Sequence, residues 1–362
     1  MEIARRKSKA VKIGNVLIGG SNPVAIQSMT KTRTSDIENT VRQINQLGDA
    51  GCQIVRLAIN DFDDAVSLKK IKPRVKLPLV ADIHFNFRLA IAAIENGADK
   101  IRLNPGNIDK KQEIEAVISA LKAAGIPLRI GLNSGSVKSA GAKKSAMSSR
   151  LVSSCMSYIK MVERLKFNNI VISLKANNVL DTLEAYRKIS RLCGYPLHLG
   201  LTATGSVYNG IIKSSVALGA LLLEGIGDTI RVSLTEKPIE EVRAAKCILE
   251  SLGLRSFGPQ VISCPTCGRC KVNLVGIVKD LESKLADRNY AQLSRPLKLA
   301  IMGCVVNGPG EAKEADIGVA FGKGQGVLFE HGKIVRKIAP KDCVRIVLRE
   351  LKTKEKKWPI KR

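Results

Sequence analysis

Three of the nine cysteines lie close together, in the segment SCPTCGRC at residues 263–270. Cys264, Cys267 and Cys270 form a C-x2-C-x2-C pattern, and thiolates at this spacing can bind zinc, form a redox dithiol or hold an iron–sulfur cluster. A zinc ribbon needs a second C-x-x-C pair or two histidines, and neither follows. Three close thiols also exceed what a dithiol needs. The pattern therefore favours an iron–sulfur cluster.

A further thiol and a carboxylate lie in a later loop, GCVVNGPGE, which contains Cys304 and Glu311. Spacing alone nominates Cys304 as the fourth ligand beside Cys264, Cys267 and Cys270, as in a ferredoxin that carries electrons on a [4Fe–4S] cluster. The glycines and the proline would fold the loop back tightly, so the Glu311 carboxylate can reach the same cluster. A carboxylate binds iron more weakly than a thiolate and can be exchanged for a substrate oxygen. Both an electron carrier and a catalyst stay open at this point.

Cationic residues end several short apolar runs between residue 24 and about residue 235. Arg56, Arg102, Arg129 and Lys175 stand at equivalent places in their runs. Guanidinium groups pair bidentately with phosphate oxygens, so these four cations predict a ligand with more than one phosphate. The alternative is that each cation only pairs with a neighbouring carboxylate. Other side chains at the ends of such runs are expected to line the same site: Met29, Asp82, His84, Asn133 and Arg231.

The runs that carry these residues alternate with amphipathic stretches. We find eight of them: VAIQSM, IVRLAI, LPLVADIHF, KIRLNPG, LRIGLNSGS, IVISLKA, LHLGLTATG and DTIRVSL. Stretches such as DIENTVRQINQLGDAG, FRLAIAAIENGAD and VLDTLEAYRKISRLCG separate them and predict helices followed by a glycine cap. Eight such units predict a TIM (β/α)8 barrel, because an open sheet usually has about five or six strands. The polar strand ends would then form the mouth of the barrel.

The character of the sequence changes near residue 258. We expect a substrate-binding barrel domain at 1–257 and a cluster domain at 258–362. The second unit reads as α+β, with a helix-like NLVGIVKDLESKLADR, a strand LKLAIMG and a hairpin in DIGVAFGKGQGVLFEHGKIVRKI. No Walker loop or dinucleotide fingerprint occurs in it.

The composition is that of a globular protein, with 45% hydrophobic residues among 362. No apolar run has the length of a membrane span or the form of a signal peptide, so we expect a cytoplasmic protein without a membrane partner. The 59 Lys and Arg against 32 Asp and Glu give a net charge of +27, which attracts phosphates, nucleic acid or acidic proteins. Only 4% of the residues are aromatic and no stacking motif accompanies the charge, so nucleic acid is not expected.

Six segments together resemble the 4-hydroxy-3-methylbut-2-enyl diphosphate synthase family of the methylerythritol phosphate route to isoprenoids. They are QSMT, ADIHF, IRLNPGN, EGIGDTIRVSL, CPTCGR and GCVVNGPGE, and the last two are the most specific. The resemblance spans nearly the whole chain. It implies an iron–sulfur oxidoreductase with a TIM barrel followed by a smaller domain similar to sulfite reductase or ferredoxin units. The implied reaction is the reductive ring opening and dehydration of 2-C-methyl-D-erythritol 2,4-cyclodiphosphate to (E)-4-hydroxy-3-methylbut-2-enyl diphosphate.

The resemblance also implies roles for individual residues. The [4Fe–4S] cluster would be held by Cys264, Cys267, Cys304 and Glu311, which leaves Cys270 outside the ligand set. Glu224 of EGIGDTIRVSL is implied as the proton donor, although an isolated Glu there is more typical of a surface charge. The diphosphate would contact a set of barrel residues: Arg56, Arg102, Arg129 and Lys175, with Asp82 and Asn133 nearby.

The implied partners are a reduced flavodoxin or ferredoxin as electron donor and a second copy of the chain in a homodimer. The basic chain would attract such acidic donors. Two alternatives compete with this interpretation. One is a four-cysteine electron-transfer module fused to a phosphate-binding barrel, and the other is a zinc-dependent nucleic-acid-binding protein.

Overall fold

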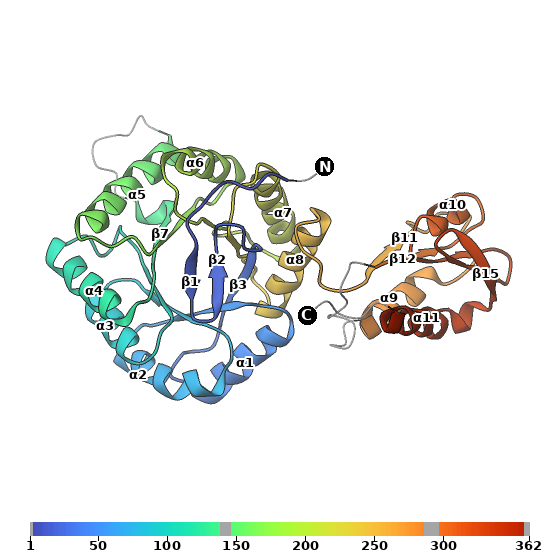
Figure 1. Ribbon diagram of the computed structural model, residues 1–362, viewed down its shortest axis with the longest axis horizontal. Helices are drawn as coiled ribbons and strands as arrows, with labels where there is room; N and C mark the ends of the chain where they lie inside the picture. Colours follow the sequence, from blue (N-terminus) through green and yellow to red (C-terminus); the bar gives the residue numbers. More distant parts are fainter. Residues whose placement is uncertain (1–2, 138–145, 286–296, 358–362) are drawn as a thin grey trace. The chain divides into compact units, whose positions relative to one another are not determined.

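A computed structural model describes residues 3–137, 146–285 and 297–357. The chain divides into two compact units, Met1–Arg255 and Ser256–Arg362 (Figure 1). The first unit carries the cationic strand ends and the second carries the clustered cysteines. In the described part of the chain, no helix is both long enough and apolar enough to cross a membrane.

The first unit is an eight-stranded parallel barrel, as the eight apolar runs predict. Its sheet has the order β8-β7-β6-β5-β4-β3-β10-β9, and an isolated parallel bridge between Ile172 and Leu197 links β8 to β9 and closes the ring. The strands are β3 (Ala25–Met29), β4 (Ile54–Ala58), β5 (Leu79–Ile83), β6 (Lys100–Leu103), β7 (Leu128–Asn133), β8 (Ile170–Lys175), β9 (His198–Leu199) and β10 (Thr229–Ile230).

Helices α1 to α8 form a ring around these strands (Figure 1). Asp36 and Asn178 cap α1 and α6, each accepting a hydrogen bond from a backbone N–H of the first turn. Left-handed glycines follow α1 and α3, at Gly51 and Gly97, whereas α6 ends at the extended residue Cys193. The helices are α1 (Ile37–Asp49), α2 (Phe62–Ile71), α3 (Phe87–Glu95), α4 (Lys111–Ala124), α5 (Met147–Arg164), α6 (Val179–Leu192), α7 (Val207–Leu223) and α8 (Pro238–Ser251).

A short hairpin closes one end of the barrel. Strands β1 (Val11–Ile13) and β2 (Val16–Ile18) pair antiparallel and lie over the centre of the ring in Figure 1. The buried side chains Ile13 and Ile18 pack against residues near the start of the barrel strands, including Ile54 and Val80. Because this end is filled by apolar side chains, a ligand can enter the barrel only from the carboxyl ends of the strands.

The last two barrel strands are shorter than their apolar runs predict. Only His198–Leu199 and Thr229–Ile230 form ladder pairs. Gly200 follows β9 at once, and a Cβ on it would lie 2.8 Å from both the Lys175 Nζ and the Arg231 carbonyl oxygen. The remaining residues of these runs therefore leave the ladder, and several of them line the cavity described below.

The second unit is a five-stranded sheet in the order β11-β12-β13-β14-β15. Its first three strands are parallel and the last three are antiparallel, which confirms the hairpin expected from the sequence. Helices α9 and α11 cover one face through a core of large apolar side chains, and among the described elements only the short α10 packs on the other. The elements are β11 (Gln260–Ser263), α9 (Leu274–Leu285), β12 (Lys298–Met302), α10 (Gly308–Lys313), β13 (Ile317–Phe321), β14 (Gly326–Glu330), β15 (Lys333–Ile338) and α11 (Cys343–Lys357).

Candidate functional site

A polar cavity of about 290 Å³ opens at the carboxyl ends of the barrel strands. The structure brings eight of the residues expected at this site to its wall. Leu201, Thr202, Ala203 and Ser233, which follow β9 and β10, complete the lining. The eight are Met29, Arg56, Asp82, His84, Arg102, Asn133, Lys175 and Arg231.

Asp82 joins the cations on one side of the cavity. Its carboxylate accepts a hydrogen bond of 2.9 Å from Arg102 Nη1 and lies 3.5 Å from Arg56 Nε. Arg102 also contacts His84 Nε2 at 3.0 Å and donates to the Gly131 carbonyl at 2.9 Å. The same His84 Nε2 atom lies 3.5 Å from Asp82 Oδ2, so His84 belongs to the network around Asp82 and Arg102. These bonds fix both guanidinium planes before any ligand binds.

The cavity carries more positive than negative charge. Its lining holds four cationic side chains, Arg56, Arg102, Lys175 and Arg231, and one carboxylate, Asp82. Burial alone would raise the pKa of Asp82, but Arg56 and Arg102 hold it well below its ordinary value. Burial lowers the pKa of Arg56 to about 10. An anion in the cavity would relieve the repulsion among the cations.

Burial and neighbouring cations act in the same direction on Lys175. Its side chain is buried, and burial together with Arg129 and Arg231 pushes its pKa well below the ordinary value. A phosphate group bound next to Lys175 would favour the charged form of its amine.

Two glycines make room for the cations inside the barrel. A Cβ on Gly131 would lie 2.6 Å from Arg102 Nε, and a Cβ on Gly200 would lie 2.8 Å from Lys175 Nζ. No real Cβ atom tolerates such contacts with neighbours that are themselves packed. The absence of a side chain at Gly131 and at Gly200 therefore determines where the Arg102 and Lys175 side chains lie.

Arg129 does not line the cavity. It is 1% exposed and lies below the cavity wall, where its Nη2 donates to Ser173 Oγ at 3.0 Å. Arg129 is the ladder partner of Arg102. Gly131 and Asn133 lie further along β7, toward the carboxyl ends of the strands. The sequence places all four cations at strand ends, whereas the structure leaves this one out of the cavity lining and buries it beside Ser173.

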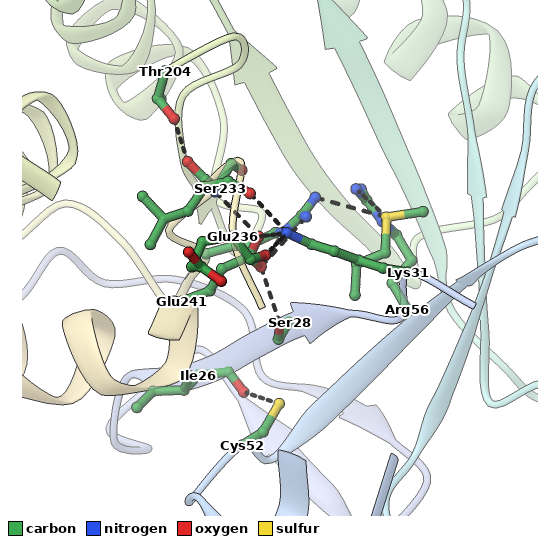
Figure 2. A network of polar contacts seen from close by, with 12 residues as sticks. Ile26, Ser28, Lys31, Cys52, Arg56, Thr204, Ser233, Glu236 and Glu241 are labelled. Atoms are coloured by element: carbon green, nitrogen blue, oxygen red, sulfur yellow. Dashed lines mark hydrogen bonds and ion pairs between the residues drawn. The ribbon is translucent and has the colours of Figure 1, made fainter. Parts of the chain in front are cut away.

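Glu241 is a buried acid that the sequence does not single out. It is 2% exposed, lies in the first turn of α8, and accepts a hydrogen bond from Ser28 Oγ at 3.0 Å. Its carboxylate also lies 3.4 Å from the Arg231 guanidinium and 3.6 Å from Lys31 Nζ (Figure 2). Lys31 donates further to backbone carbonyls, including that of Leu234 at 2.7 Å. The sequence pattern that could have indicated this residue is the acidic pair Glu240 and Glu241 at the start of a helix, of which Glu241 faces inward.

The structure places Glu224 elsewhere. It caps the carboxyl end of α7, and helix ends lie at the face of a TIM barrel opposite the mouth. Its half-exposed side chain forms a bidentate pair with Arg187, with Nε–Oε2 at 3.0 Å. Arg187 holds the pKa of Glu224 below its ordinary value, so the carboxylate is charged at neutral pH. This geometry gives Glu224 no route to a ligand in the cavity.

The clustered cysteines of the second unit lie at one edge of its sheet. Cys264 directly follows β11 and Cys304 follows β12, and these strands are parallel neighbours with Ser263 opposite Ile301. The Gly303 N–H donates to Cys264 Sγ at 3.3 Å, so the two loops are in contact. Glu311 lies in the first turn of α10, which follows the second loop.

Backbone N–H groups surround one of these thiols. The amides of Val306 and Asn307, with a contribution from Arg269, hold the pKa of Cys304 below its ordinary value despite partial burial. A thiolate is the form that binds iron. Cys270 differs, because its S–H donates to the Val272 carbonyl at 3.3 Å and its sulfur lies against Gly303.

The donor set has the chemistry of an iron–sulfur site. Three thiols come from two adjoining loops and one carboxylate comes from the first turn of α10, with N–H groups directed at two of the sulfurs. Within the described ranges, no three His, Cys, Asp or Glu side chains are arranged to hold a single metal ion. The residues fit a cluster by type and by position along the sheet edge.

The fold resembles that of a solved enzyme structure. The dihydropteroate synthase of Yersinia pestis aligns with a TM-score of 0.50, at 12% identity, over 68% of this chain and 99% of that chain. At this identity the likeness shows the barrel fold alone.

The curated relatives are much more similar. The chain is 49% identical to a protein of Fusobacterium nucleatum over 96% of both chains. It is 48% identical to one of Clostridium perfringens over 96% of this chain and 99% of the relative. Both relatives are 4-hydroxy-3-methylbut-2-en-1-yl diphosphate synthases (flavodoxin).

Both units also match domains of a single family. Residues 8–246 match the GcpE TIM-barrel domain and residues 260–353 match the GcpE protein C-terminal domain. The two matches follow the order of the two compact units along the chain. The chain therefore belongs to the GcpE family.

Proposed function

We propose that this chain is a 4-hydroxy-3-methylbut-2-enyl diphosphate synthase. It takes 2-C-methyl-D-erythritol 2,4-cyclodiphosphate, breaks the ring C–O bond with two electrons and protons, and releases one water and the allylic diphosphate. The observation that carries the proposal is the cation-rich cavity at the barrel mouth of a GcpE chain. The names of the relatives support the same reaction.

The cavity residues bind the diphosphate. Arg56, Arg102, Lys175 and Arg231 direct their donors to phosphate oxygens, and bidentate guanidinium contacts fix the orientation of the ring. Asp82 holds Arg56 and Arg102 in place and is too strongly ionised to give up a proton. The carboxamide of Asn133 offers both a donor and an acceptor to the substrate hydroxyls.

Arg129 and Met29 support this arrangement from within the barrel. Arg129 adds positive charge below the cavity without reaching its surface. The Met29 sulfur lies 3.1 Å from Arg56 Nε and limits where that guanidinium can move. His84, with its side chain 43% exposed, lines the cavity, and its Nε2 contacts Arg102.

A [4Fe–4S] cluster would be held by Cys264, Cys267, Cys304 and Glu311. When bound, it supplies single electrons and Lewis acidity at the iron that a carboxylate holds. Cys264 and Cys304 receive backbone N–H groups that stabilise thiolates, whereas Cys267 is exposed. Cys270 bonds within the unit and is not a ligand.

The protein takes its electrons from a reduced flavodoxin and works as a homodimer in the cytoplasm. The flavodoxin is the donor printed in the names of the relatives, and the charge of +27 suits an acidic donor. Glu224 has no part in the mechanism, because it is ionised and ion-paired outside the cavity.

An anaerobic assay tests the proposal directly. Purified, cluster-loaded protein is mixed with the cyclodiphosphate and a viologen reductant, and the allylic diphosphate is measured. We expect turnover by wild type and a loss of about 100-fold in kcat/KM for Arg102→Met, since a charged hydrogen-bond donor is worth about 1.5–3 kcal/mol. Arg187→Met is the matched control on the outer surface. No turnover by brown, cluster-loaded wild type would overturn the proposal, and a colourless zinc protein would exclude the iron–sulfur site.

A further inference from the structure

An apolar depression of about 350 Å³ lies on one face of the second unit's sheet. Its floor and walls include Val327 and Phe329 of β14, Ile334 of β15, and Val305 and Pro309 from the loop that follows Cys304. Phe329 is the ladder partner of Ile334, so both strands contribute to the same face.

The depression exists because this face is only partly covered. Helices α9 and α11 bury the opposite face, whereas α10, which packs on this one, has only six residues and spans about 9 Å. Ile334 is consequently 67% exposed, and the neighbouring loop side chains Val305 and Val306 are 64% and 61% exposed. Contiguous exposed apolar side chains of this kind mark interaction surfaces.

The rim of the depression is cationic. Lys313, Lys323 and Lys337 line it and are exposed, and no Asp or Glu side chain does. Within the described ranges, none of these three lysines forms an ion pair. An apolar centre with a positive rim is complementary to a partner with an apolar centre and a negative rim.

The charge of the rim favours one kind of occupant. An acidic protein would be attracted, and charge complementarity also raises the rate of a transient encounter. The surface thus suits an acidic protein that binds briefly.

The position of the depression connects it to electron transfer. Val305 is bonded to Cys304, and Pro309 lies two residues before Glu311. Cys264, which follows β11, packs against the small apolar residues beneath α10 as well as against the core on the opposite face. A carrier seated here would bring its redox group next to the loop that holds two of the proposed cluster ligands.

We propose that this surface, defined by Val305, Ile334, Lys323 and Lys337, is the docking site for a reduced flavodoxin, an acidic one-electron carrier. The inference rests on the proposed function, because it needs an enzyme that receives electrons at these loops. The inference adds the surface at which the electron donor binds.

The test compares two electron sources in the same variants. Lys323→Glu/Lys337→Glu is assayed anaerobically with the cyclodiphosphate, once with a reduced bacterial flavodoxin and once with a small viologen. We expect the KM for flavodoxin to rise about tenfold or more, with a weaker dependence on salt, because rim charges act mainly on association. Turnover with viologen and iron content stay at the wild-type level. The control is Lys279→Glu, an exposed lysine on α9 across the sheet.

The outcomes separate the docking surface from the reaction. An unchanged KM for flavodoxin in the double variant would overturn the docking site while leaving the enzyme intact. Equal loss with flavodoxin and viologen would also overturn it and would indicate that the lysines serve a contact within the enzyme. Absence of turnover by wild type with either reductant would instead remove the proposed function. Ile334→Ser, which keeps the charge, is expected to raise the same KM and leave the viologen reaction unchanged.

Discussion

The cavity of the barrel and the cysteine loops of the second unit are held in different ways. In the barrel, buried side chains bond to one another, as Arg102 does to Asp82 at 2.9 Å with both almost fully buried. In the second unit, the thiols lie in partly or fully exposed loops, and their partners are backbone N–H groups. The barrel site is thus preorganised by its own charges, whereas the second site depends on the geometry of two loops.

This difference predicts different responses to substitution. A change in the barrel should alter charge balance and show in stability as well as binding. A change in the cysteine loops should alter cofactor content and leave the barrel's affinity for substrate unaffected.

The largest effect is expected for Cys304→Ser compared with Cys270→Ser. The first change removes a proposed ligand whose thiolate is stabilised by two backbone amides, so we expect loss of bound iron and of turnover. The second removes a thiol that bonds to the Val272 carbonyl, so iron should be retained. Iron and sulfide per chain after anaerobic reconstitution measure both. Loss of iron in Cys270→Ser would favour the four-cysteine electron carrier.

Asp82→Asn tests whether ion pairs hold the barrel site. Breaking a buried pair leaves two cations uncompensated, and we expect a loss of about 3 kcal/mol in unfolding free energy at pH 7. The folded pKa of Asp82 is lowered, so its contribution is present above the unfolded value of about 3.9 and is lost as pH falls through the folded value. The difference between wild type and variant should therefore shrink below about pH 4.

Denaturant unfolding between pH 3 and 7 measures this dependence. Asp61→Asn provides the control, because Asp61 pairs with Arg33 at the surface and Asn keeps the cap of α2. A constant difference across the pH range would show that Asp82 acts through packing rather than charge.

Lys175→Met should change stability and binding in opposite directions. Removing a buried cation from a cationic cavity is expected to stabilise the ligand-free protein by about 1 kcal/mol and to weaken cyclodiphosphate binding by about tenfold. The lowered pKa means that the unfolded chain binds the Lys175 proton more tightly, so wild-type stability rises with pH toward the ordinary lysine value and the gain shrinks. Thermal unfolding with and without ligand checks both signs. If Lys175→Met were less stable than wild type, repulsion among the buried cations would not be the dominant effect.

The smallest effect is expected for Glu224→Gln. The residue is half-exposed and pairs with Arg187 at the surface, so the loss in stability should be under about 1 kcal/mol. Turnover should stay within about twofold of wild type, because the pair lies outside the cavity lining. A large fall in kcat with intact iron would return Glu224 to the mechanism.

Much of the fold follows from the sequence alone. The eight apolar runs correspond to the eight barrel strands, and α1, α3 and α6 lie within the predicted helical stretches. The sequence does not predict where β9 and β10 end. The run of apolar residues continues past the point at which the Gly200 contact and the cavity end the ladder. Period and composition report burial, and the apolar residues Leu201, Val232 and Leu234 stay buried after the ladder ends.

Only part of the site could be predicted from the sequence. Arg56, Arg102 and Lys175 lie at strand ends and face the cavity. Arg129 is the ladder partner of Arg102 but lies outside the cavity lining, and the apolar runs do not indicate which side chains of a strand reach the cavity. Glu241 arrives from a helix that follows the barrel strands, so no strand-end pattern includes it. The resemblance also cannot give the side of the barrel on which Glu224 lies.

Gly131 and Gly200 have a consequence for how this protein can vary. The space of one methyl group at either position is already occupied by Arg102 Nε or Lys175 Nζ. An alanine there would therefore displace a cation of the proposed diphosphate site, although no residue that lines the cavity is itself replaced. Two positions that shape the site are thus residues that have no side chain.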